Sequence, residues 1–146
     1  MNDYIKQAMQ FDQSDDQYAE ALARMSDPQM IRLFHAFIGM TTEVGELFDQ
    51  FKKHIFYGKE LDLVNLAEEI ADSDWYRAVA IDALSKLLNR DSLELEDHID
   101  KNNIAKLSVR YKKGFSKDAA LNRDLDAERK ILESLNTQSD NGSSQR

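Results

Sequence analysis

Two pairs of acidic residues in the sequence have a spacing that could build a cation site. Glu43 and Glu46 are three positions apart, and so are Glu69 and Asp72. Residues three apart lie on one face of a helix, so each pair offers two neighbouring carboxylates. Two like charges ~4 Å apart repel by about 4 kcal/mol at an effective dielectric constant of ~20. The pairs therefore either point apart into water or share a cation.

The ion expected between such carboxylates is a hard, oxygen-seeking one. Mg²⁺ prefers oxygen ligands, and Mn²⁺ is a possible substitute for it. The sequence has no cysteine, which excludes disulfides and thiolate metal sites. Any metal must therefore be held by oxygen or imidazole ligands.

Both acidic pairs fall in the middle of long predicted helices. Asp27-Pro28 is typical of a helix start, with an N-cap acid before a proline at the first helical position. Gly58 predicts the end of this helix, and a second helix is expected over about residues 61–88. Two long helices joined by a short loop form an antiparallel hairpin, which can bring the two acidic pairs to similar heights.

An apolar stripe at alternating spacings of three and four runs along the first of these helices and predicts a packed helix seam. It consists of Phe34, Phe37, Thr41, Val44, Phe48, Phe51 and Ile55. Glu43 and Glu46 lie roughly 100° or more from this seam, as they would on a solvated face. Ala36 and Gly39 share their flank, where small residues let another helix approach closely. Spacing alone is compatible with a metal site and with a solvated acidic face.

The remainder of the chain is also predicted to be helical. Residues 3–25 form a weakly amphipathic start, which a capping box at Ser14 and Gln17 can divide into two pieces. A further helix is expected over about residues 93–112 and ends at Gly114.

A last helix is expected over residues 117–135. The tail of residues 136–146 is rich in Ser, Asn, Gln and Gly and is predicted to be disordered. The expected fold class is all-α, a helical bundle of four to five helices completed by oligomerisation, in one domain of residues 1–135.

Charge and hydropathy exclude several classes of protein. The net charge is −8, and an acidic surface repels phosphates, which argues against DNA or RNA as a partner. No apolar run approaches the ~20 residues that span a bilayer, and no basic segment precedes an apolar one as in a signal peptide. A cytoplasmic protein with no membrane partner is expected.

The two acidic motifs resemble those of the all-α nucleoside triphosphate pyrophosphatases, which include MazG, the dimeric dUTPases and the dCTP pyrophosphatases. Residues 42–47 look like the first motif of that superfamily, and residues 68–72 look like the second. Residues 102–111, with Gly114-Phe115, are similar to the segment that follows in short, often phage-encoded, MazG-like proteins. The resemblance covers roughly residues 30–125.

This resemblance implies a Mg²⁺-dependent hydrolase that converts a nucleoside triphosphate and water to a nucleoside monophosphate and pyrophosphate, with deoxynucleotides as the expected substrates. The positions that match the catalytic, metal-binding carboxylates are Glu43, Glu46, Glu69 and Asp72. Mg²⁺ neutralises phosphate oxygens and helps to orient a water for in-line attack. Glu68 also falls in the motif but points a further 100° round the helix, so we expect it to support a ligand or to lie on the surface.

Several residues match the substrate-contacting positions of the family. Asn103, Lys106 and Arg110 lie on one stripe at spacings of three and four, where cations could meet phosphate oxygens. A polar surface face is the alternative for them. Tyr76, one turn after the second motif, contacts a base or sugar in the implied site, or else packs between helices. Tyr111 contacts substrate or anchors the helix end.

The implied partners are a nucleoside triphosphate and further copies of the chain. Full-length MazG proteins carry the domain twice, whereas this chain has a single copy. Because single-domain members of the family assemble their sites across subunits, a homodimer or homotetramer is expected. The flank with Ala36 and Gly39, together with the long seam, fits such an assembly.

Two other functions compete with this one. A ferritin-like di-iron protein needs Glu-x-x-His pairs, and none of the three histidines, His35, His54 and His98, has a glutamate three residues before it. The second alternative is a non-enzymatic helical interaction module, in which the seam binds a partner helix. In that case the paired acids and the Asn/Lys/Arg stripe would be coincidental.

Overall fold

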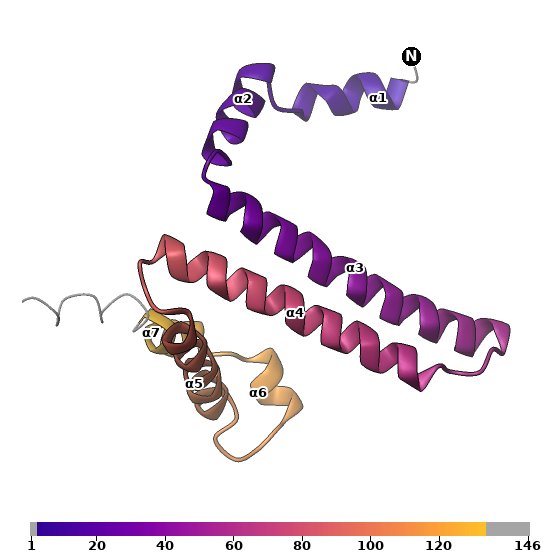
Figure 1. Cartoon of the computed structure of the whole chain (residues 1–146), viewed down its shortest axis with the longest axis vertical. Helices are drawn as coiled ribbons and strands as arrows, with labels where there is room; N and C mark the ends of the chain where they lie inside the picture. Colours follow the sequence, from indigo (N-terminus) through magenta and orange to yellow (C-terminus); the bar gives the residue numbers. More distant parts are fainter. Residues whose placement is uncertain (1–2, 134–146) are drawn as a thin grey trace, which may run out of the picture. The chain divides into compact units, whose positions relative to one another are not determined.

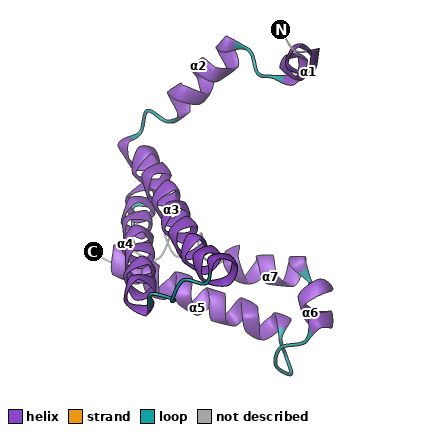
Figure 2. Cartoon of the chain, turned by 90° about the vertical axis from the view of Figure 1, so that its right-hand side faces the viewer, coloured by secondary structure: helices purple, strands orange, loops and turns teal. Residues whose placement is uncertain are grey.

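The computed structural model describes residues 3–133, most of which are helical (Figure 2). The elements, labelled in Figure 1, are α1 (Asp3–Ala8), the 3₁₀ helix η1 (Met9–Phe11), α2 (Asp15–Arg24), α3 (Pro28–Tyr57), α4 (Leu63–Leu87), α5 (Ser92–Arg110), α6 (Lys117–Leu121) and α7 (Leu125–Leu132). Residues 3–133 contain no strand, so the all-α class is confirmed. None of these helices is both long and apolar enough to cross a bilayer.

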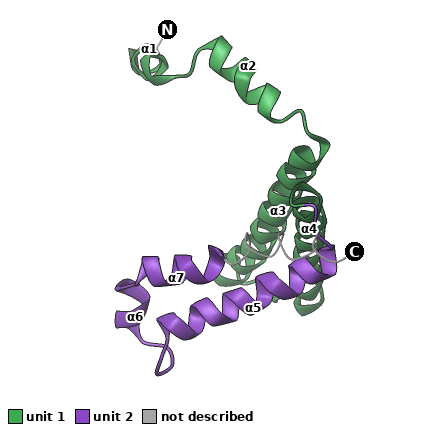
Figure 3. Cartoon of the chain, turned by 90° about the vertical axis from the view of Figure 1, so that its left-hand side faces the viewer, with its two compact units in different colours: residues 1–88 green, residues 89–146 purple. Residues whose placement is uncertain are grey.

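Contacts along the chain divide it into two compact units, residues 1–88 and residues 89–146 (Figure 3). The first unit holds α1 to α4 and the second holds α5 to α7. One domain over residues 1–135 stays a prediction. The tail of residues 136–146, predicted to be disordered, lies outside the described residues.

The predicted boundaries of the two long helices are confirmed. Asp27 caps α3 by accepting a hydrogen bond from the backbone N–H of Gln29 at 2.7 Å. Gly58 ends α3 with a φ of 66°, in the left-handed region that favours glycine. Asp62 caps α4 by accepting from the backbone N–H groups of Val64 and Asn65.

The expectation of four to five helices is too low for the described residues, which form seven α-helices. The capping box is present: the Ser14 hydroxyl accepts from the backbone of Gln17, whose side chain accepts from the backbone of Ser14. It separates α2 from α1. The helix expected over residues 117–135 is also divided, because Asp124 caps a new helix by accepting from the backbone of Ala127 at 3.0 Å.

Helices α3 and α4 lie side by side as the expected antiparallel hairpin (Figure 1). The buried residues of α3 are Ala36 and Gly39, so the small-residue flank is the face that meets α4. A Cβ atom on Gly39 would lie only 2.2 Å from Cε1 of the Tyr76 ring. The absence of a side chain at Gly39 therefore allows Tyr76 to pack directly on the α3 backbone.

The apolar stripe of α3 is exposed in the single chain, so the prediction of a packed seam is wrong at this level. Phe48 is 70% exposed and Phe51 is 44% exposed, and the other large members, Phe34, Phe37, Val44 and Ile55, are also exposed. The physical reason is which face of α3 packs against α4. Since α3 turns its small residues toward α4, the aromatic stripe about a third of a turn away cannot face α4 as well.

Polar contacts fix the register of the hairpin. Arg32 of α3 forms an ion pair with Asp82 of α4 at 2.7 Å. Near the opposite end of the hairpin, the Gln50 amide donates a hydrogen bond to the side-chain oxygen of Asn65. The acidic motifs lie between these two contacts and therefore come to similar heights.

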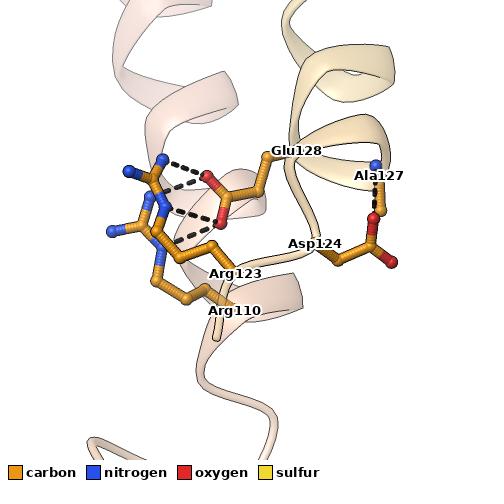
Figure 4. A network of polar contacts seen from close by, with 5 residues as sticks. All are labelled: Arg110, Arg123, Asp124, Ala127 and Glu128. Atoms are coloured by element: carbon orange, nitrogen blue, oxygen red, sulfur yellow. Dashed lines mark hydrogen bonds and ion pairs between the residues drawn. The ribbon is translucent and has the colours of Figure 1, made fainter. Parts of the chain in front are cut away.

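In the second unit, a buried carboxylate joins α5 to α7 (Figure 4). Glu128 is only 3% exposed. It accepts hydrogen bonds from Nε and Nη2 of Arg110 at 2.9 and 2.7 Å, and from the same nitrogens of Arg123 at 3.4 and 2.6 Å. The two guanidinium groups thus hold both oxygens of one carboxylate.

We expect this contact to make the second unit sensitive to acid. Hydrogen bonds from Arg110 and then from Arg123 lower the pKa of Glu128 from 4.5 to about 2. Because folding lowers this pKa, the contact stabilises the fold above about pH 4.5, and its contribution is lost as the pH falls toward 2. Glu128→Gln should lower the melting temperature at pH 7 and have a much smaller effect at pH 3.

Thermal unfolding followed by circular dichroism between pH 3 and pH 7 measures this difference. Glu133→Gln is the control, because Glu133 pairs with Arg129 in an exposed i, i+4 contact that contributes little. An equal loss for Glu128→Gln at both pH values would contradict the expected linkage.

Candidate metal centre

Three carboxylates converge on the inner face of the hairpin. Glu43 comes from α3, and Glu69 and Asp72 come from α4. One oxygen from each lies within 4.8 Å of the others. Oxygens this close together could bind one hard divalent cation. We call Glu43, Glu69 and Asp72 the acidic triad.

Burial increases from one side of the acidic triad to the other. Asp72 is exposed, Glu43 is half-buried and Glu69 is only 5% exposed. A buried carboxylate is costly unless it is paired or binds a metal. Glu69 is therefore not part of a solvated face, whereas that alternative remains open for Asp72, which is exposed.

Electrostatic strain within the acidic triad is visible at Glu43. A hydrogen bond with Glu69 raises the pKa of Glu43 above its ordinary value, and burial and the charges of Glu69, Glu46 and Asp72 raise it further. Burial and neighbouring negative charges thus make the ionised form of Glu43 less favourable than it is in water. A divalent cation would relieve the same repulsion.

Two amide side chains orient the most buried member of the acidic triad. Asn65 donates a hydrogen bond from Nδ2 to Oε1 of Glu69 at 2.8 Å, and Gln50 in turn donates to Asn65. The amide of Asn65 is therefore fixed on both sides. Sequence reasoning missed both residues, although a polar residue one turn before Glu69 on the same face was a usable signal.

Removing this support should weaken cation binding without removing a ligand. Loss of a hydrogen bond to a metal ligand typically costs 10- to 100-fold in metal affinity, so we expect Asn65→Ala to raise the Mg²⁺ dissociation constant by about that factor. Gln50→Ala, which removes only the outer amide, should have a smaller effect. Titration of Mg²⁺ into the full chain, followed by the fluorescence of Trp75, measures both variants. Unchanged affinity in Asn65→Ala would refute the supporting role.

Two glutamates of the motifs lie outside the acidic triad. Glu46 is exposed and borders a shallow surface groove together with Asp49 and Lys53. Its charge nevertheless contributes to the raised pKa of Glu43. Glu68 is exposed, as expected for a residue that points away from the ligands. The structure thus brings together three of the four predicted metal ligands.

Tyr76, one turn after the second motif, has a packing role in this structure. The Tyr76 ring covers Gly39 and meets the ring of His35 edge-on, with 5.7 Å between the ring centroids. The ring of Trp75 lies 4.6 Å from it. Tyr76 therefore holds α4 against α3 one turn away from Asp72, and contact with a base or sugar stays a prediction.

The remaining predicted substrate contacts belong to α5 and its end, in the second unit. Asn103 is exposed and Lys106 is half-buried. Arg110 binds Glu128, which was not predicted. Tyr111 ends α5, and its ring lies 5.6 Å from that of Phe115. This contact is compatible with anchoring of the helix end, and both roles of Tyr111 stay predictions.

Comparison of the chain with models of protein families, with curated proteins and with solved structures finds no match. The resemblance to MazG-like proteins stays a prediction that rests on the motifs. The structural basis for a function is therefore the acidic triad and the residues that contact it.

Proposed function

We propose that this chain is a Mg²⁺-dependent nucleotide pyrophosphohydrolase of the MazG-like kind, which converts a nucleoside triphosphate to a monophosphate and pyrophosphate. The observation that carries the proposal is the acidic triad, with oxygens within 4.8 Å of one another and its central member, Glu69, buried. Such a set of carboxylate oxygens is suited to binding a hard divalent cation.

On this proposal, different carboxylates bind the metal and accept the proton. Glu43, Glu69 and Asp72 hold Mg²⁺, which supplies positive charge for the phosphate oxygens and for the charge that develops on them. Water attacks in line, the phosphoanhydride bond between the α and β phosphates breaks, and pyrophosphate leaves. A carboxylate that the metal does not saturate accepts the proton of the water. Glu46, exposed and outside the acidic triad, is available for that role.

The substrate contacts that the resemblance implies include two residues of α5. Asn103 and Lys106 lie one turn apart on α5 and offer an amide and a cation to phosphate oxygens. Deoxynucleotides are the substrates we expect, and Tyr76, four positions after Asp72, is the aromatic side chain that the resemblance assigns to the base or sugar.

The exposed apolar stripe of α3 supports assembly into a homodimer or homotetramer. Stable interfaces bury about 800 Å² on each partner, and an aromatic side chain can contribute up to 150–250 Å², so a stripe with four phenylalanines is of the right size. A second copy that covers the stripe would turn the two-helix hairpin into a four-helix bundle.

We expect the wild-type chain to be dimeric or tetrameric by light scattering, and Phe48→Glu to be monomeric. Phe48 lies on the stripe and is 70% exposed, so the variant places a charge in the proposed interface without disturbing the packing of the single chain. Phe11→Glu is the control, because Phe11 is 90% exposed and lies outside the stripe. A wild-type monomer at tens of micromolar would contradict the expected assembly.

Product analysis tests the reaction type. Incubation with a panel of ribo- and deoxynucleoside triphosphates and Mg²⁺, followed by phosphorus NMR, should show a monophosphate and pyrophosphate in equal amounts. A diphosphate with inorganic phosphate would place the cleavage at the other anhydride bond and exclude a pyrophosphohydrolase.

An interaction module is the second candidate, and the exposed stripe of α3 is the observation that favours it. An adaptor that binds a partner helix on this stripe needs no cation, so Mg²⁺ should leave its melting temperature unchanged. A cation that binds only the native state must raise that temperature. A rise that Glu69→Gln abolishes would favour the enzyme over the adaptor.

A further inference from the structure

The second unit contains a pocket of about 460 Å³, and no residue of the acidic triad lines it. It lies between the end of α5, the turn that follows, α6 and the start of α7. Its volume is within the range of about 300–1,000 Å³ that is usual for small-molecule sites. The charged side chains that line it are four cations and three acids.

Two arginines of the pocket bind a single carboxylate. One arginine in a bidentate contact can pair with both oxygens of a carboxylate. Glu128 nevertheless accepts hydrogen bonds from two arginines, Arg110 and Arg123. The Arg110 side chain is only 15% exposed. Two guanidinium groups around one carboxylate leave a net charge of +1 at this contact, and the Arg123 side chain is 41% exposed, so this charge is open to an anion from solvent.

Each arginine has a nitrogen that does not bind Glu128, and the Arg110 guanidinium also lies 5.7 Å from the centroid of the Tyr111 ring. The four hydrogen bonds to Glu128 use Nε and Nη2 of each arginine, so Nη1 takes part in none of them. Figure 4 shows the two guanidinium groups on one side of the carboxylate, each with an outer nitrogen that points away from it. Glu128 therefore holds the two guanidinium groups next to each other.

Two lysines reach the same pocket from a tight turn. The backbone N–H of Gly114 donates to the carbonyl of Tyr111 at 3.0 Å, which places Lys112 and Lys113 at the two central positions of the turn. Gly114 has a φ of 87°, in the left-handed region. Both lysines are exposed and line the pocket.

The two other acids of the pocket are engaged in local contacts. Asp118 accepts a hydrogen bond from the side chain of Asn122 at 2.6 Å, and Asp124 caps α7 through the backbone of Ala127. In Figure 4 the carboxylate of Asp124 lies on the far side from the two arginines. The acids thus serve the fold of the unit, whereas the lysines remain available to a ligand.

We propose that this pocket is a phosphate-binding site, in which Arg110 and Arg123 bind a phosphate group of a small molecule and Lys112 and Lys113 add positive charge. Paired guanidinium groups match the oxygens of a phosphate, and lysines act as point charges beside them. The resemblance includes Arg110 alone, whereas the other three cations come from the structure. The site does not require a metal in the acidic triad.

Binding of inorganic pyrophosphate to the full chain in EDTA tests this site apart from any metal or catalysis. Titration by calorimetry should show saturable binding, which Lys112→Ala combined with Lys113→Ala should weaken by about tenfold or more. The lysines make no contact with Glu128, so this variant keeps the arginine pair intact. Arg129→Ala combined with Lys130→Ala removes the same charge from exposed positions of α7 and should bind as the wild type does.

The ligand's source is tested by a second arm, in which adenosine 5′-monophosphate replaces pyrophosphate. Tighter binding of the nucleotide would support a nucleoside phosphate, with the exposed ring of Phe115 beside the base, and tighter binding of pyrophosphate would support a free polyphosphate. Absence of saturable binding in both arms would overturn the proposal. An equal loss of affinity in the α7 control would also overturn it, because binding would then reflect total charge.

Discussion

Glu69→Gln should reduce Mg²⁺-dependent release of pyrophosphate at least about a hundredfold, because it weakens the binding of the cation that would stabilise the charge developing on the phosphate. Glu69 is the most buried member of the acidic triad and contacts both Glu43 and Asn65. Glutamine has the same shape and can still accept the hydrogen bond from Asn65 through its carbonyl oxygen. The substitution therefore removes the negative charge while it disturbs the packing very little.

The neighbouring residue supplies a matched control for this experiment. Glu68 belongs to the same motif but is exposed and lies outside the acidic triad. Glu68→Gln should keep its rate within about twofold of the wild type, since an exposed carboxylate of this kind contributes little to a site it does not touch. Initial rates at saturating Mg²⁺, with melting temperatures measured in parallel, decide the comparison. Equal losses in the two variants would count against the acidic triad.

Gly39→Ala should destabilise the hairpin by about 1–3 kcal/mol, the usual cost of overpacking a contact. The new Cβ would lie 2.2 Å from Cε1 and 2.3 Å from Cδ1 and Cζ of the Tyr76 ring. Rotation of the Tyr76 ring about its own axis cannot relieve this clash alone, because three ring atoms are about equally close to the new Cβ. Either Tyr76 leaves the interface or α3 and α4 move apart.

Gly45→Ala is the opposite case on the same helix. No atom lies within 4 Å of the position that a Cβ on Gly45 would take, and alanine favours a helix interior over glycine by about 0.5–1 kcal/mol. Gly45→Ala should therefore stabilise the chain. Urea denaturation of both variants measures the change in the free energy of unfolding. A change of the same sign in both variants would contradict the packing described for Tyr76.

Features that depend on neighbouring residues could be predicted from the sequence. The boundaries at Asp27-Pro28 and Gly58, and the capping box at Ser14, each need only a few adjacent residues. The convergence of the acidic motifs followed from the two helices and the short loop between them. The flank of Ala36 and Gly39 was identified for the same reason, since helical spacing places residues on faces.

Features that depend on what covers a face could not be predicted in this way. Periodicity shows that the stripe of α3 is apolar, but it cannot tell whether α4 or another chain covers that stripe. The supporting amides Gln50 and Asn65 are 15 positions apart and come from different helices. Arg110 and Glu128 are 18 positions apart, with α6 between them. No local pattern links such pairs, because only the tertiary fold brings them together.

The most direct measurement is pyrophosphate release from deoxynucleoside triphosphates by the full chain, first with Mg²⁺, then with EDTA, and then after Mg²⁺ is restored. If the acidic triad binds the catalytic cation, release should stop in EDTA and return with Mg²⁺ in the wild type and in Glu68→Gln, but not in Glu69→Gln. Release that continues in EDTA, or that Glu69→Gln retains, would contradict a metal-dependent pyrophosphohydrolase centred on these carboxylates.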